Sequence, residues 1–110
     1  MQHHRSIFLC RQAIKVFHIT EAVAAAARAR VKSLWQEVAN AALHVLDIDS
    51  AIAALREAGN ASMVLGLERL RCTEDRYLLA GHVLALTEKD YDTAQVRFHQ
   101  HSYLYQGTSP

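Results

Sequence analysis

Apolar residues recur at helical spacing through the middle of the chain. Between residues 30 and 46 they lie three or four positions apart, at Val31, Leu34, Trp35, Val38 and Leu43 among others. Polar residues fill the other face, so this segment is predicted to form an amphipathic helix. The same pattern predicts helices over 50–58, 61–71, 74–87 and 91–101, with a polar turn at 88–91. A further helix is predicted over 6–27, where the apolar period is less regular.

Polar residues and glycine separate these predicted helices. Asp49 is the predicted N-cap of the helix over 50–58, because its carboxylate can accept from the first free backbone N–H groups. Gly59 and Asn60 end that helix, since both tolerate a left-handed backbone. Helices joined by such short turns stack antiparallel. With one Pro, four Gly and abundant alanine in 110 residues, the predicted fold class is all-α, built of antiparallel helical hairpins.

Large and small apolar positions alternate as in helix-turn-helix repeats of the tetratricopeptide type. Trp35 and Ala51 are 16 residues apart, and Leu78 and Ala94 have the same separation. This weak repeat has a period of 43 residues, with an irregular hairpin around 61–71 between its two copies. The predicted repeat positions are Trp35, Ala39, Ala51, Leu55, Ala58, Leu78, Ala94 and Phe98. The sequence therefore predicts a tetratricopeptide-like α-solenoid, a class that presents surfaces to other proteins.

The length allows one small domain. Residues 1–36 carry six basic residues against Glu21 alone, whereas the whole chain has a net charge of only +1. That net charge gives no signature of nucleic-acid or acidic-membrane binding. We expect a basic N-terminal helix or leader over 1–28, helical repeats over 29–101 and a frayed tail over 102–110. A mitochondrial transit peptide is the alternative for the basic segment 1–36. It is disfavoured because transit peptides are usually rich in serine, and this segment has only Ser6 and Ser33.

No segment has the apolar core of a secretory signal or the length of a membrane span. Cys10 and Cys72 are far apart and match no metal or redox spacing, so they are interpreted as reduced thiols of a cytosolic protein. Seven histidines are scattered, and His99 and His101 point to different sides of a helix. We therefore expect no metal, no cofactor and no enzymatic activity, with catalysis by Cys72 as the alternative.

One stretch of sequence resembles a known family. The residues that carry the resemblance are the segment 46–52, Leu55, Gly59-Asn60, and above all Glu74-Asp75 followed by the string 78–82, Leu-Leu-Ala-Gly-His. They resemble the α-solenoid of the WD-repeat subunits of intraflagellar transport complex A. The resemblance covers about residues 31–98, while 1–28 and 99–110 depart from it. It implies a slice of a longer protein in which β-propellers precede the solenoid, so this chain is expected to be a fragment or a shortened product.

The family implies a function as a protein-interaction scaffold in retrograde ciliary transport and cilium assembly. The implied partners are other complex A subunits, and the implied location is the cilium or flagellum and the basal body, with a cytoplasmic pool. A vesicle-coat-type trafficking solenoid is the alternative within the same class, and a small enzyme using Cys72 is the alternative of another class. A solenoid slice without polar capping repeats is also expected to self-associate or to be marginally stable in isolation.

Overall fold

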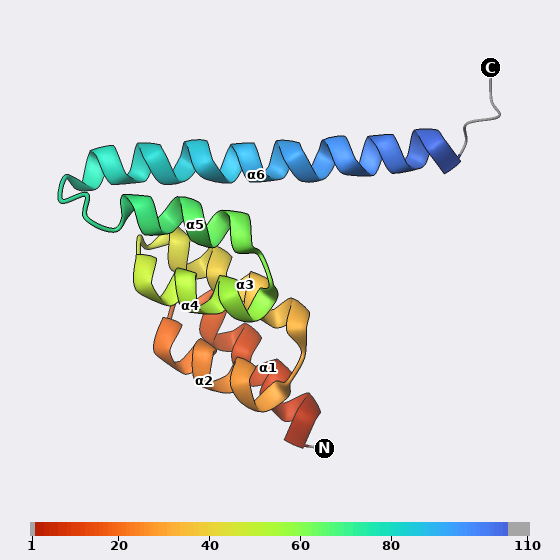
Figure 1. Cartoon of the computed structure of the whole chain (residues 1–110). Helices are drawn as coiled ribbons and strands as arrows, with labels where there is room; N and C mark the ends of the chain where they lie inside the picture. The colour runs from red at the N-terminus through yellow and green to blue at the C-terminus, as the bar shows by residue number, and fades with distance from the viewer. Residues whose placement is uncertain (1, 106–110) are drawn as a thin grey trace.

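The computed structural model describes the backbone of residues 2–105 and the side chains of residues 4–92. Over this range the protein holds six α-helices and no strand (Figure 1). Their bounds are α1 Gln2–Lys15, α2 Ile19–Ala29, α3 Lys32–His44, α4 Ile48–Ala58, α5 Ala61–Leu70 and α6 Arg76–Tyr105. The predicted fold class, all-α with antiparallel helical hairpins, is confirmed.

The helices stack in chain order. Helices α1 and α2 form one hairpin, α3 and α4 form a second that packs on the first, and α5 packs on α4. Helix α6 runs alongside α5 at the end of the stack opposite the N-terminus and then continues past it (Figure 1). None of the helices, within the described residues, is long and apolar enough to cross a membrane.

The turns after α1, α3 and α4 share one backbone geometry. Each places a residue in the left-handed region: Phe17 at φ 57°, Leu46 at φ 59° and Gly59 at φ 80°. The N–H that follows this residue bonds to a carbonyl five residues back, as from Asp47 to Ala42 at 2.8 Å and from Asn60 to Leu55 at 3.0 Å. This is the Schellman arrangement, which satisfies the last carbonyls of a helix. It reverses the chain within about two residues and so fixes each hairpin.

The first two hairpins are copies of one another. Phe17 and Leu46, the left-handed residues inside the two hairpins, are 29 residues apart, and so are Arg30 and Gly59, which end them. Buried residues follow the same offset, and the pairs are Cys10 with Ala39, Ala13 with Ala42, Ile19 with Ile48, Ala22 with Ala51 and Ala25 with Ala54. The period that governs the helices is therefore 29 residues, shorter than the period of 43 inferred from the sequence.

Alanine dominates the core between these hairpins. Nine of its buried residues on α2, α3 and α4 are alanines, namely Ala22, Ala25, Ala26, Ala29, Ala39, Ala41, Ala42, Ala51 and Ala54. Small side chains let helix axes approach closely, and the larger residues fill the remaining space. The larger residues buried there and under α6 are Leu34, Val38, Leu43, Ile52, Leu55, Leu67, Leu79 and Val83. Trp35, a predicted repeat position, is only partly buried.

Several expected element boundaries differ from those of the structure. The single helix over 6–27 is two helices, because the chain turns at residues 16–18. The polar turn over 88–91 does not exist, because α6 is continuous through it, so Leu78 and Ala94 lie on one helix. The N-cap of α4 is Asp47, whose Oδ1 accepts from the Ser50 N–H at 3.2 Å, and not Asp49. Of the predicted tail over 102–110, the first four residues lie in α6 and 106–110 fall outside the described residues.

Candidate protein-interaction surface

The predicted repeat positions lie in different parts of the stack. Ala39, Ala51 and Leu55 are fully buried between α3 and α4 and their neighbours. Trp35 and Ala58 are half-buried, and Leu78 on α6 is exposed. Ala94 and Phe98 lie outside the residues whose side chains are described. The hairpin α3–α4 thus brings together the first five positions, whereas Leu78 points away from the stack.

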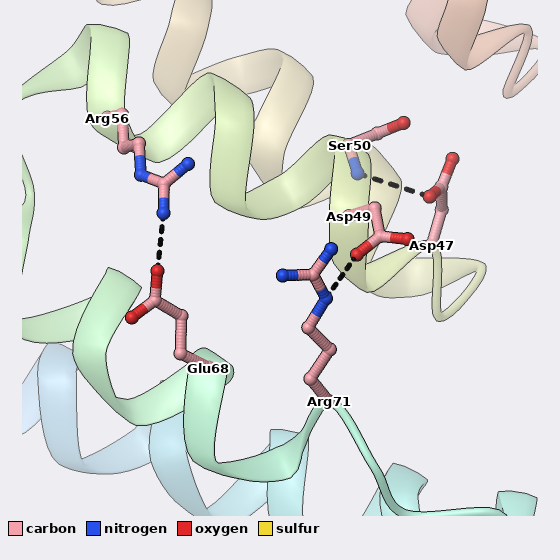
Figure 2. Close-up of polar contacts among 6 residues, drawn as sticks. All are labelled: Asp47, Asp49, Ser50, Arg56, Glu68 and Arg71. Carbon is pink, nitrogen blue, oxygen red and sulfur yellow. Dashed lines mark hydrogen bonds and ion pairs between the residues drawn. The ribbon is translucent and has the colours of Figure 1, made fainter.

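Two ion pairs join α4 to the α5 end of the stack (Figure 2). The Arg56 guanidinium contacts the Glu68 carboxylate on α5, and Arg71 Nε donates to Asp49 Oδ1 at 2.8 Å. All four side chains are largely exposed, so each pair contributes at most about 1 kcal/mol. Their main effect is orientation, because they tie the C-terminal end of α5 to both ends of α4. Asp49, expected as a cap, instead anchors the residue that follows α5.

Asn60 and Gly66 set the contact between α5 and α6. Asn60 Oδ1 accepts from the Met63 N–H at 3.3 Å and so caps α5, while its Nδ2 donates to Asp90 Oδ2 on α6 at 3.4 Å. A Cβ at Gly66 would lie 2.7 Å from a methyl of Leu86. Gly66 therefore allows the close packing of α5 against α6 inside the molecule. Gly81 does not, since a Cβ there would meet nothing within 4 Å.

The described residues hold no group of three or more His, Cys, Asp or Glu side chains placed to bind a metal. Cys10 is fully buried, and its Sγ–H donates to the Ala22 carbonyl at 3.4 Å. Burial raises the pKa of the Cys10 thiol, and the nearby Glu37 carboxylate adds to the rise while Arg11 opposes it. A raised pKa disfavours the thiolate, so Cys10 is suited to packing and not to nucleophilic chemistry. Cys72 is exposed in the turn after α5, and His82 is exposed on α6.

Apolar surface remains exposed at both ends of the stack. One patch, here called the first-hairpin face, lies along α1 and α2 and is a groove lined by Leu9, Gln12, Ala13, Val16, Glu21, Ala24, Ala25 and Arg28. The other, here called the outer face of α6, consists of Tyr77 and Leu78, then Gly81 one turn later and Leu84 one turn after that. The opposite side of α6, with Leu79 and Val83, is buried against the stack.

Sequence patterning missed both faces. On α6 the buried and exposed apolar stripes lie on opposite sides, so the helix has no clear amphipathic period. On α1 the signal was present in the 29-residue repeat. Leu9 is the equivalent of Val38 and Leu67, which are both fully buried, yet Leu9 is 41% exposed. The position that is buried in α3 and α5 is therefore partly exposed to solvent in α1.

These features define a class. The chain is a stack of antiparallel helical hairpins with open ends, as found in α-solenoid scaffolds, which bind other proteins along their surfaces. Over 64 residues it is 42% identical to WD repeat-containing protein 19 of Homo sapiens and 39% identical to the protein of the same name from Mus musculus. This similarity confirms, for that segment, the resemblance carried by the sequence motifs.

The matched segment is 58% of this chain and 5% of each relative. The chain thus spans a small part of the length of the curated proteins that it matches. No family model matches the chain, and no solved structure matches it.

Proposed function

We propose that this chain acts as a helical scaffold segment in intraflagellar transport complex A. The similarity to WD repeat-containing protein 19 over 64 residues carries the proposal. In this role the segment contributes to retrograde ciliary transport and cilium assembly, catalyses no reaction and contacts other complex A subunits. It resides at the cilium or flagellum and the basal body, with a cytoplasmic pool.

The packing of the hairpins supports a scaffold role. Helices α3, α4 and α5 are joined by tight turns, an alanine-lined core and the ion pairs of Arg56 and Arg71. Such a unit holds a fixed shape and leaves its outward side chains available for neighbours. By contrast, Cys72, the exposed one of the two cysteines, lies in the turn after α5 and not on a packed helix.

The test is co-purification from ciliated cells that express the tagged chain. We expect it to recover complex A subunits, identified by mass spectrometry. Ala51→Glu should abolish recovery, because Ala51 is fully buried between helices, while Ala53→Glu, on the exposed side of the same helix, should leave recovery unchanged. Recovery of vesicle-coat subunits in place of complex A subunits would instead support the coat-type alternative.

The enzyme alternative is tested with Cys72→Ser in the same cells. The scaffold proposal predicts normal recovery of complex A subunits and normal cilium length for this variant, because Cys72 is exposed in a turn outside the hairpin core. A loss of cilia at unchanged protein level and unchanged recovery would favour chemistry at Cys72.

A further inference from the structure

We infer that the outer face of α6 of one copy of this chain docks onto the first-hairpin face of a second copy, so that the hairpin stack continues from chain to chain. The two faces lie at opposite ends of the stack (Figure 1). This homotypic contact is separate from the ciliary role proposed above and can fail without affecting it.

The 29-residue repeat shows that the first-hairpin face has the form of an internal packing surface. Leu9 and Gln12 on α1 correspond to Val38 and Ala41 on α3. The α3 residues are buried, at 0% and 5% exposure, in the helix that packs against the preceding hairpin. On α1 the same positions form a groove with the small side chains of Ala24 and Ala25 at its base. A groove of this shape accepts a helix that brings apolar side chains.

The outer face of α6 presents the exposed apolar side chains that such a groove accepts. Tyr77 is 93% exposed, and Leu78 and Leu84 are more than half exposed, around Gly81. A glycine inside a helix costs about 1 kcal/mol relative to alanine. Gly66 offsets this cost through its contact with Leu86, whereas nothing in the described part of the molecule approaches Gly81. Its bare backbone permits another helix to come close, with the flanking tyrosine and leucines filling the groove.

The charges around the two faces favour this pairing over the pairing of like faces. Helices α1 and α2 carry Arg5, Lys15 and Arg28 beyond Arg11, which pairs with Glu37 of α3 at 3.4 Å. Their one acidic residue, Glu21, lines the groove beside Arg28 and contacts His18 at 3.5 Å, and Arg5 precedes Leu9 by one turn, so the surroundings of the groove are basic on balance. The outer face of α6 continues into Glu88 and Asp92, and Glu74 and Asp75 precede the helix. Opposite charges therefore meet when α6 docks on the first hairpin, while two α6 helices would set acidic residues against one another.

Because the two faces differ, the contact is heterologous and leaves a free face at each end of a dimer. Copies can then add in a row. We expect sedimentation velocity of the full chain to show association that increases with protein concentration and weakens with added salt, since part of the attraction lies between exposed charges. A monomer at every concentration would overturn the inference and leave these faces to other proteins.

Two single variants and their mixture test the arrangement. Val16→Glu places a carboxylate in the groove, and Leu84→Glu places one on the outer face of α6; both side chains are about 60% exposed, so the fold should persist. Each variant alone should associate at least about tenfold more weakly than the wild type, because one of its faces is blocked by a buried charge. Mixed in equal amounts, they should form a dimer that grows no further, since each supplies the face that the other lacks.

Two outcomes would contradict the docking of α6 on the first hairpin, and they differ from each other. Wild-type association by Val16→Glu would show that α6 pairs with α6, and a monomeric mixture would show that the two faces do not meet. Leu65→Glu is the matched control, because Leu65 is an equally exposed leucine on α5, outside both faces, and should leave association unchanged. Far-UV circular dichroism of each variant at low concentration verifies that the helices are retained.

Discussion

At the residue scale, small side chains decide how closely the helices of this protein approach. Ala39, Ala51 and Ala54 are fully buried, and Gly66 lies under Leu86. Buried alanine contributes little apolar area, so its value here is geometric: it lets larger neighbours such as Leu34 and Leu55 fill the space between axes. Substitutions at these positions should therefore act through volume and charge more than through lost contacts.

The two helical glycines give a matched pair of variants. Gly81→Ala should raise the free energy of unfolding by about 1 kcal/mol, because alanine favours the helix and meets no neighbour. Gly66→Ala gains the same propensity but forces the methyl groups of Leu86 to move, so its net stabilisation should be smaller than that of Gly81→Ala. Urea unfolding at low protein concentration measures both values. Equal stabilisation by the two variants would contradict the packing of α5 against α6.

The two cysteines should differ in reactivity. Cys10 is buried and its pKa is raised, which disfavours the reactive thiolate, whereas Cys72 is exposed. We expect a thiol reagent at neutral pH to label Cys72 rapidly and Cys10 only when the first hairpin opens. Mass spectrometry of the labelled peptides distinguishes the two sites. Fast labelling of Cys10 in the folded protein would show that α1 does not pack as described.

At the element scale, the helices that sequence patterning located well are those with strong signals at both ends. The predicted spans 30–46, 50–58 and 61–71 correspond closely to α3, α4 and α5, because Gly59 and Asn60 mark a turn and the apolar period between the turns is regular. The turn after α1 carries no such signal. Phe17 adopts the left-handed conformation there, at φ 57°, although aromatic residues rarely do.

In the long final helix α6, the sequence predicts a turn where the structure has none. The polar residues Glu88, Lys89 and Asp90 are typical of a turn, but they continue α6, with Glu88 and Lys89 exposed and Asp90 half-buried beside Asn60. Sequence alone could not separate these meanings, because charged residues are common both in turns and on exposed helix surfaces. The same exposure hid the apolar outer face of α6, since helical periodicity detects one buried stripe and this helix has two apolar sides.

Helix α4 offers a direct test of hairpin packing. Ala51→Glu should lower the free energy of unfolding by at least about 3 kcal/mol, because the carboxylate has no room and no partner between α3 and α4. Ala53→Glu, two residues along the same helix and exposed, should change it by less than about 0.5 kcal/mol. Thermal unfolding followed by circular dichroism measures both. Similar melting temperatures for the two variants would refute the orientation of α4.

At the scale of the whole molecule, the chain is a stack and not a globule. Its radius of gyration is 16.1 Å, with principal extents of 50 × 43 × 20 Å; a compact domain of this length has a radius of about 13 Å. Each hairpin contacts mainly its neighbours along the chain. Stability in such an arrangement comes from successive interfaces, and both end faces remain available for contacts with other chains.

The scaffold role proposed for this hairpin stack rests on its similarity to WD repeat-containing protein 19, and one measurement tests it most directly. The matching segment of the human protein is replaced by the segment of this chain, and the chimera is expressed in ciliated cells from which the human protein has been deleted. We predict that the chimera restores cilium length and the return of cargo from the tip. Chimeras with Ala53→Glu or Cys72→Ser should do the same, while Ala51→Glu should fail. Full rescue by Ala51→Glu, or failure of Cys72→Ser at normal protein level, would contradict the account.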